Sequence, residues 1–295
     1  NATGLHLFSE YERSPYSYDL LVGLTQVRKC VVSDMDNDKK PDIMLFSSGY
    51  DGMPFPGDSL AIFYPKDIKY QFLGQDIGYY HGGATGDINN DGLIDIVAYS
   101  GGSAVIPVHP TSYLNKGNRN FELNKQVFKN FNQGPDNYYT VELFDINKDG
   151  NLDLFLGSSK ILRMIPSANG IFDRAKAINF QVDSNLELMD IAFLDFDFDG
   201  KIDVLTMSNK EGYNGYGLRL YLNKDNGFIE STKNYFDVTD EIGKGAWIKW
   251  IRLFDYDKDG DIDVVGDGLF GALNGSRGSR IFWKNESGKF KHVRL

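Results

Sequence analysis

One acidic pattern occurs five times along the chain and limits the folds open to it. Each copy has Asp at its first, fifth and ninth positions and Asp or Asn at its third. The copies begin at Asp34, Asp87, Asp145, Asp195 and Asp255, at intervals of 53, 58, 50 and 60 residues. Self-similarity at a period of about 55 residues indicates a fold built from several equivalent units.

Short apolar runs flank the acidic segments. Val31-Val32 precedes the first segment, and Ile43-Met44-Leu45-Phe46 follows it. Such β-branched and aromatic runs, bounded by turn residues, predict strands. Each repeat has a third run and then a fourth that starts at a phenylalanine: Phe72, Phe121, Phe172, Phe228 and Phe290. Four short strands in each of several radial units predict an all-β fold, a β-propeller.

We expect five four-stranded blades in one propeller domain that spans residues 26–295. The blades are expected at about 26–76, 77–134, 135–183, 184–242 and 243–295. Residues 1–25 are too short for a blade, and we expect an extra or ring-closing strand there. The alternative is that this segment belongs to a longer ring.

The acidic segments have the composition of calcium loops. Oxygen ligands at alternating positions, with Gly at the sixth, wrap a turn around a hard cation, and Ca²⁺ takes six to eight oxygens. An EF-hand is excluded, because strands flank the loops and position 12 is never Glu. The alternative is a set of solvated Asp and Asn turns. Four carboxylates within nine residues repel one another without a counter-ion, which favours the metal.

We therefore predict up to five structural Ca²⁺ ions, one in each loop between the first and second strand of a blade. The predicted ligands are Asp34, Asp36, Asp38, Asp42, Asp87, Asn89, Asp91, Asp95, Asp145, Asn147, Asp149, Asp153, Asp195, Asp197, Asp199, Asp203, Asp255, Asp257, Asp259 and Asp263. The first loop departs from the pattern, because Lys39 stands at position 6 and Pro41 precedes Asp42.

The strand–DxDxDGxxD–strand unit, followed by runs such as Leu220-Tyr-Leu-Asn223 and Gly227-Phe228, resembles the FG-GAP/VCBS repeat. The resemblance covers about residues 26–295. It implies propeller blades like those of the integrin α-chain head and of several secreted lectins, with calcium in the first loop of each blade. It also implies an extracellular, periplasmic or cell-surface location, where millimolar calcium would fill weak sites. The resemblance does not fix the ligand, because one fold hosts many functions.

The connectors and long loops on the face opposite the acidic loops are the expected ligand-binding region. Aligning the repeats on their first Asp places equivalent residues around the mouth of the central channel. Aromatic faces together with hydrogen-bonding groups suit sugar rings. The ligand-binding candidates are Arg28, Tyr79, His81, Tyr139, Glu187, Trp247 and Lys249, and Met189 completes the ring of Arg28, His81, Tyr139 and Lys249. The alternative is that these aromatic residues pack between blades.

Composition excludes several classes of protein. A formal net charge of −10 argues against a nucleic-acid binder, and no apolar run is long enough for a transmembrane segment. The single cysteine, Cys30, excludes an internal disulfide framework and reads as a buried thiol. The predicted metal ligands include 18 of the 41 acidic residues, so the remainder of the chain is basic by eight charges. An anionic polysaccharide is therefore among the candidate ligands.

The function that these features predict is a secreted or surface-attached, calcium-stabilised β-propeller that binds a glycan or a protein. The alternative is a carbohydrate-active hydrolase or lyase at the channel mouth, which would need two suitably spaced acids. The candidate acids outside the loops are Asp51, Glu142, Glu187, Asp190 and Asp267. Since no HExxH, GxSxG or Walker motif is present, binding is favoured over catalysis. The oligomeric state is left open.

Overall fold

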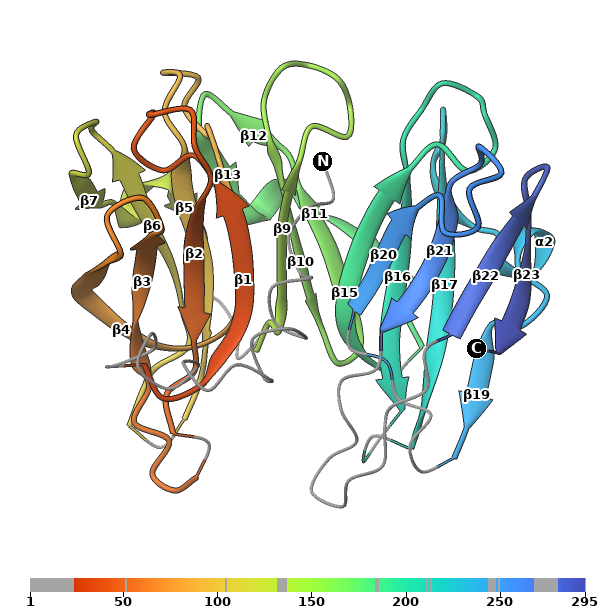
Figure 1. Ribbon diagram of the computed structural model, residues 1–295, viewed down its shortest axis with the longest axis horizontal. Coiled ribbons are helices and arrows are strands. Elements are labelled where there is room, and N and C mark those ends of the chain that lie inside the picture. The colour runs from red at the N-terminus through yellow and green to blue at the C-terminus, as the bar shows by residue number, and fades with distance from the viewer. Residues whose placement is uncertain are drawn as a thin grey trace. The chain divides into compact units, whose positions relative to one another are not determined.

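The computed structural model describes residues 24–50, 52–103, 105–131, 137–183, 186–210, 212, 214–243, 248, 250–267 and 281–294. Within them the regular structure is almost entirely strand (Figure 1). The exceptions are one four-residue helix, α2 (Thr232–Tyr235), and two 3₁₀ turns, Lys125–Val127 and Arg174–Lys176. The predicted all-β class is confirmed. None of the described helices has the length and apolar character needed to cross a membrane.

The chain divides into two compact units. The first consists mainly of residues 3–156 and 164–178, and the second of residues 157–163 and 179–295. The segment expected to close the ring falls almost wholly on residues 1–23, outside the described residues.

The first unit contains a seven-stranded sheet in which strands adjacent in sequence are adjacent in space (Figure 1). Its strands are β1 (Val27–Ser33), β2 (Asp42–Ser47), β3 (Asp58–Tyr64), β4 (Lys69–Gly86), β5 (Asp95–Gly101), β6 (His109–Asn115) and β7 (Phe121–Leu123). β4 is 18 residues long and serves two repeats. Its first part pairs with β3, with Lys69 opposite Tyr64, and its last part pairs with β5, with Gly86 opposite Asp95. The last strand of one repeat and the first strand of the next are therefore continuous.

The third repeat departs from the four-strand pattern. Its main sheet has the order β14-β11-β10-β9. These strands are β9 (Thr140–Phe144), β10 (Asp153–Ser158), β11 (Ile161–Ile165) and β14 (Ile178–Phe180). Phe172 was expected to start the outer strand, but it lies in β13 (Ile171–Asp173), which pairs with β12 (Ser167–Ala168) and, in parallel, with β8 (Phe128–Lys129). The outer strand comes instead from residues that follow a 3₁₀ turn.

The second unit contains two further sheets. One comprises β15 (Leu186–Leu194), β16 (Asp203–Lys210), β17 (Gly215–Lys224) and β18 (Gly227–Glu230), and β19 (Asp240–Ile242) also pairs with β17. The other comprises β20 (Trp250–Phe254), β21 (Asp263–Asp267), β22 (Ile281–Glu286) and β23 (Lys289–Arg294). In both sheets an acidic segment joins the first strand to the second.

Aromatic side chains dominate the core of the second unit. Trp283 is fully buried; its ring meets Tyr216 edge-on at 5.8 Å, and its indole nitrogen donates to the Val238 carbonyl at 2.8 Å. Phe236 and Phe290 stack at 4.7 Å beside it. Such pairs add to the free energy gained by burying apolar area. Packing between sheets thus accounts for much of the high aromatic content of the chain.

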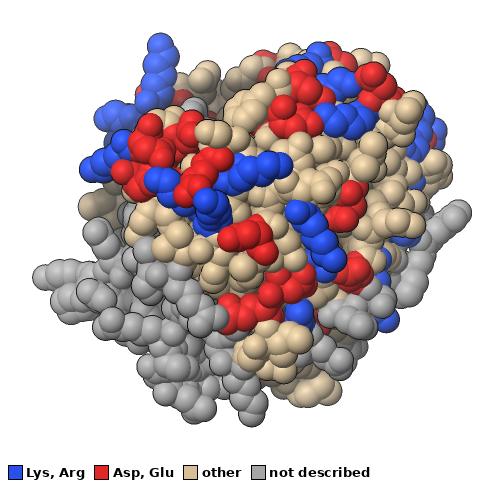
Figure 2. All heavy atoms as spheres, turned by 90° about the vertical axis from the view of Figure 1, so that its right-hand side faces the viewer, with Lys and Arg blue, Asp and Glu red and all other residues tan. Residues whose placement is uncertain are grey.

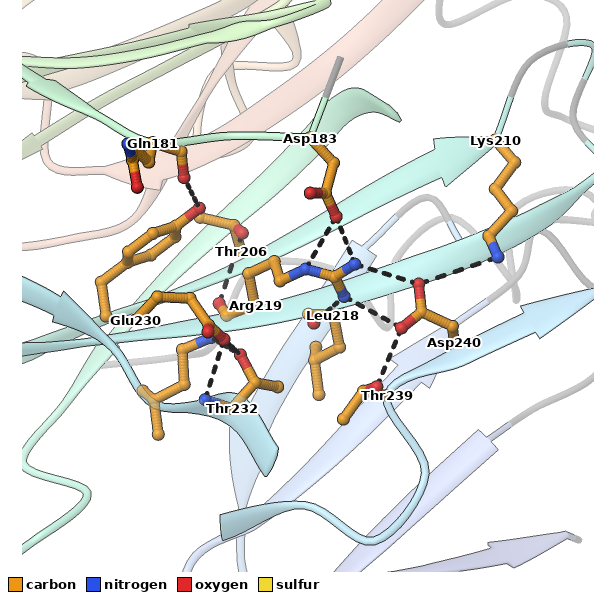
Figure 3. Close-up of polar contacts among 12 residues, drawn as sticks. Gln181, Asp183, Thr206, Lys210, Leu218, Arg219, Glu230, Thr232, Thr239 and Asp240 are labelled. Atoms are coloured by element: carbon orange, nitrogen blue, oxygen red, sulfur yellow. Dashed lines mark hydrogen bonds and ion pairs between the residues drawn. The ribbon is translucent and has the colours of Figure 1, made fainter. Parts of the chain in front are cut away.

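A network of ion pairs connects β17 to two neighbouring segments (Figure 3). The Arg219 guanidinium lies between two carboxylates: its Nε donates to Asp183 at 3.1 Å, and its terminal nitrogens donate to Asp240 at 3.1 and 3.2 Å. Asp240 begins β19, and Asp183 precedes β15. Because an arginine fork matches carboxylate geometry, Arg219 ties both segments to the third strand of its repeat.

Cys30 is a buried thiol, as its apolar context predicts. It packs with Leu45 and Ala61 in a small cluster of the first unit.

Gly83 in β4 lies against the buried ring of Phe46. A Cβ added at Gly83 would lie 1.9 Å from Phe46 Cε1, whereas one added at Gly74 of the same strand would have no neighbour within 4 Å. We predict that Gly83→Ala lowers the free energy of unfolding by about 1–3 kcal/mol through overpacking, and that the control Gly74→Ala leaves it within about 0.5 kcal/mol. Urea unfolding measures both values. Equal stabilities of the two variants would contradict this packing.

Candidate functional site

The five acidic loops share one backbone conformation. The fourth residue of every loop has a positive φ, from 57° at Lys148 to 65° at Lys258. The sixth residue is also left-handed, with φ between 85° and 101° in the four loops that have Gly there. In the first loop this residue is Lys39, with a φ of 66°. A side chain is therefore held where the other loops use the conformational freedom of glycine.

Hydrogen bonds within each loop turn the acidic side chains toward its centre. In the fourth loop the Asp195 carboxylate accepts from the backbone amides of Asp199 and Gly200 at 3.1 and 2.9 Å. Asp197 accepts from the Asp199 amide at 3.3 Å, and Asp199 accepts from the Lys201 amide at 2.9 Å. The same bonds recur in the other four loops. Local sequence spacing thus determines the arrangement of the first, third and fifth side chains.

The Asp at the ninth loop position, called the ninth carboxylate below, joins the loop to the sheet. It starts the second strand, is at most 3% exposed, and accepts from the amide of the second loop residue at 2.8–3.3 Å in all five loops. In four loops its other oxygen accepts from a backbone amide that follows or ends the third strand; the donors are Asn115, Ser167, Asn223 and Asn285. Burial raises the pKa of Asp42, Asp95, Asp153 and Asp203 to about 6, and nearby loop carboxylates add to the effect.

Asparagine side chains brace three of the loops from the third strand. The Asn223 and Asn285 amides donate to the carbonyls of Ile202 and Ile262, the eighth loop residues, at 3.2 and 3.1 Å. Asn115 makes the same bond to Ile94 at 3.1 Å. These asparagines had not been assigned a role from sequence, although their recurrence at the end of the third apolar run is a visible signal.

Cationic side chains reach the loops that carry Asp at the third position. Lys224 contacts Asp197 and Asp199, Lys284 contacts Asp257 and Asp259, and Arg119 contacts Asp36. The two loops with Asn at this position instead make an internal bond: the amides of Asn89 and Asn147 each donate to the fifth-position Asp at 3.0 Å. A cation therefore offsets negative charge beside three of the loops, and asparagine lowers the negative charge by one in the other two.

The donor sets of the second to fifth loops fit a hard cation. Each offers carboxylate or amide oxygens at the first, third, fifth and ninth positions, together with glycine at the sixth. In the fourth and fifth loops the first, third and fifth carboxylates have oxygens within 4.8 Å of one another. Oxygen-only donors at this spacing are the set that Ca²⁺ prefers over transition metals. The first loop also brings Asp34, Asp36 and Asp42 together, but it has Lys39 in place of glycine at the sixth position.

A β-bulge recurs in the first strand of three repeats. The register shifts between Val27 and Lys29 in β1, between Tyr80 and Gly82 in β4, and between Leu188 and Asp190 in β15. The extra residues are Arg28, His81 and Met189, each six positions before the first loop Asp. Alignment of the sequence had placed these three residues in one ring. Bulges redirect side chains and concentrate beside functional sites.

Three of the predicted ligand-binding residues lie side by side in the first unit. The His81 ring is 4.8 Å from Tyr79 and 5.1 Å from Tyr139, centroid to centroid. Phe55, which the sequence had not singled out as a candidate, extends the row at 5.8 Å from Tyr79. All four are half-buried. We call Phe55, Tyr79, His81 and Tyr139 the aromatic row.

The other predicted ligand-binding residues have different surroundings. Arg28 donates from Nε to Ser48 Oγ at 3.1 Å. Glu187 is half-buried in β15, where it pairs with Asn209 of β16. It also forms an isolated antiparallel β-bridge with Ser159. Trp247 and Lys249 lie outside the described residues.

Two of the candidate catalytic acids are engaged in the fold. Glu142 forms an ion pair with Lys29. Asp190 accepts from the backbone amides of Ile191 and Ile251 at 3.0 and 2.8 Å. Asp51 and the side chain of Asp267 lie outside the described residues.

Replacing Lys39 with glycine should stabilise the protein. The residue has a φ of 66°, and relief of this left-handed strain should raise the free energy of unfolding by about 0.5–1 kcal/mol. The control is Lys40→Gly at the next position, which has no positive φ and should lose stability through greater chain entropy. Thermal melting of the two variants measures the difference. A lower melting temperature for Lys39→Gly than for wild type would contradict the strain.

Comparison with known proteins agrees with the repeat. The chain is similar in fold to an Agrocybe aegerita lectin described as specifically recognising non-reducing terminal N-acetylglucosamine, with a TM-score of 0.52 and 18% sequence identity. The similarity covers 92% of this chain and 66% of that one, so the chain spans just under two thirds of the lectin's length. No curated protein matches the chain. The family model for the FG-GAP-like repeat matches residues 87–156 and 195–266, and these two segments contain FG-GAP-like repeats.

Proposed function

We propose that this protein is a calcium-stabilised, five-bladed β-propeller that binds a glycan through the end of each first strand remote from the acidic loops. The observation that carries the proposal is the bulge found in three repeats, together with the aromatic row beside one of them. The proposal includes an extracellular, periplasmic or cell-surface location, where calcium is abundant enough to fill loops of modest affinity.

Calcium would be held in the second to fifth loops by the side chains at positions 1, 3, 5 and 9. Bound calcium supplies positive charge and draws these oxygens together, so its role is to hold the turn between two strands. The support is the shared loop geometry and the buried carboxylate at the ninth position. In the second, third and fourth loops burial raises the pKa of this carboxylate, which reflects the cost of negative charge there. Lys224 and Lys284 contact the third and fifth carboxylates and would give way to the metal.

Removal of calcium should lower the melting temperature by many degrees. A ligand that binds only the folded state stabilises it by about 2.7 kcal/mol per site at a hundredfold excess over its dissociation constant. We expect EGTA to abolish this stabilisation and added calcium to restore it, as followed by circular dichroism. Asp197→Ala should lose part of the calcium-dependent rise in melting temperature. Asp225→Ala, at a highly exposed residue outside the nine-residue acidic pattern, should retain all of it. Identical melting curves in EGTA and calcium would contradict structural calcium.

The position of the bulges supports a ligand face remote from the loops. A bulge residue lies six positions before the first loop Asp, which is roughly 20 Å along an extended strand. The aromatic row offers ring faces that suit the C–H surface of a sugar, and His81, Tyr79 and Tyr139 also carry polar groups. The similarity in fold to a lectin that recognises N-acetylglucosamine makes that sugar the first probe.

Substitutions in the aromatic row should weaken glycan binding without unfolding the protein. A glycan array that includes terminal N-acetylglucosamine and anionic polysaccharides selects a ligand, and calorimetry then compares the variants. We expect His81→Ala and Tyr139→Ala each to weaken binding by about two- to tenfold, since a ring contact contributes about 0.5–1.5 kcal/mol. The control is Phe72→Ala, which removes a 44% exposed aromatic from the same strand as His81 and should bind normally.

Wild-type affinity in both variants of the aromatic row would contradict this site. Capture of a protein and no glycan would favour the protein-ligand alternative. The hydrolase or lyase alternative has less support, because Glu142 and Asp190 are engaged in internal contacts. Cleavage of a polysaccharide on the array would reinstate it.

A further inference from the structure

In the first acidic loop, the guanidinium of Arg119 pairs with Asp36, the carboxylate at the third position. Arg119 donates from Nε to Asp36 Oδ2 at 2.8 Å. Its Nη2 lies 2.7 Å from the same oxygen and 2.6 Å from Asp67 Oδ2. The guanidinium carbon lies 3.8 Å from the centre of the Tyr64 ring. The Asp36 side chain is 10% exposed. Arg119 is therefore fixed by two carboxylates and an aromatic face, and not by a single surface ion pair.

The backbone of Arg119 is unusual for the turn in which it lies. Asn118 and Arg119, between β6 and β7, have φ values of 53° and 60°. Gly117, which precedes them, is also left-handed, with a φ of 79°. The shorter hairpin turns of two later repeats have two left-handed residues each, and the second is glycine: Gly170 after Asn169, and Gly288 after Ser287. Such turns favour glycine because it adopts positive φ without strain. Arg119 thus holds a left-handed conformation that favours glycine, and its side chain reaches the first loop.

Two further contacts position the β6–β7 turn, one with β4 and one with the first loop. Gln71 donates from Nε2 to the Arg119 carbonyl at 2.8 Å and accepts from Tyr64 Oη at 2.9 Å. Asn115 donates from Nδ2 to the carbonyl of Met35, the second residue of the loop, at 2.9 Å. These bonds position the arginine independently of its ion pair.

The first loop also departs from the features that the other loops share. Lys39 holds position 6 at a φ of 66°. In three other repeats, a backbone amide of the third strand donates to the Asp at the ninth loop position; the donors are Asn115, Asn223 and Asn285. Pro65 occupies the equivalent position in the first repeat. Proline has no such N–H, so Asp42 lacks this donor. Lys66 adds a second cation, 2.8 Å from Asp38.

The cations of the fourth and fifth loops differ in kind from Arg119. Lys224 and Lys284 are single ammonium groups on the third strand of the same repeat. A lysine tail has many accessible rotamers and can leave, and the loops beneath keep Gly200 and Gly260 at position 6. Arg119 comes from the next repeat and is stacked as well as paired.

We propose that Arg119 takes the place of the metal in the first loop, which therefore binds no calcium and is stable without it. The loop holds together through the guanidinium that bridges Asp36 and Asp67, and it joins two consecutive repeats of the first unit. The contrast with calcium in the other loops rests on the proposed function; the arginine bridge itself does not.

The test compares matched carboxylate variants in the whole chain. Asp36→Asn in the first loop and Asp257→Asn in the fifth occupy the same loop position and are melted in EGTA and in calcium. We expect Asp36→Asn to lower the melting temperature by a similar few degrees in both buffers and to leave the calcium-induced rise at its wild-type size. Asp257→Asn should reduce that rise. A reduced rise for Asp36→Asn would overturn the proposal.

Arg119 variants provide an independent readout in EGTA alone. Arg119→Gln should destabilise as much as Asp36→Asn, and the double variant should lose little more than either single one, because both remove the same interaction. Arg119→Lys keeps the charge without the fork or the stacking, and it should recover only part of the loss. Additive losses in the double variant would overturn the bridge. Absence of any calcium effect in all variants would defeat the proposed function but not this coupling.

Discussion

The ninth carboxylate of the acidic pattern is the interaction on which each repeat depends. It is buried at the start of the second strand, accepts from the beginning of its own loop, and in four repeats accepts from the third strand as well. One side chain thus connects three consecutive segments. The same burial raises the pKa of four of these carboxylates to about 6. A repeat built in this way needs positive charge nearby.

The repeats meet that need by different chemistry. Asparagine at the third position removes a charge and adds an internal hydrogen bond, lysine supplies an exchangeable ammonium, and Arg119 supplies a fixed guanidinium. Among the described residues of the face that Figure 2 shows, acidic and basic side chains are interspersed and form no extended patch of one sign. The acidity of the chain is therefore better understood as local compensation around loops than as attraction for a basic partner.

Much of the fold could be predicted because its determinants are local. The spacing of Asp195, Asp197 and Asp199 predicts the loop, since the hydrogen bonds that shape it span at most five residues. The alignment also placed Arg28, His81 and Met189 at equivalent positions, and all three lie in bulges. No glycine or proline at these three positions marks the bulge, so the distortion itself could not be read from the sequence.

The features that escaped prediction depend on long-range contacts. Arg119 and Asp36 are 83 residues apart, and nothing beside either residue indicates the pair. Phe172 has the local sequence of an outer strand, yet it pairs with β8 because residues 167–173 form a hairpin of their own. Phe55 likewise reaches the aromatic row from a separate segment, whereas Tyr79, His81 and Tyr139 were candidates from the sequence.

We propose that loops of a single design hold calcium wherever a fixed cation does not already fill them. The most direct measurement is the number of calcium ions bound per chain, determined by equilibrium dialysis at millimolar calcium. We predict four ions for the wild-type chain, from the second to fifth loops. A chain that binds no calcium would contradict it.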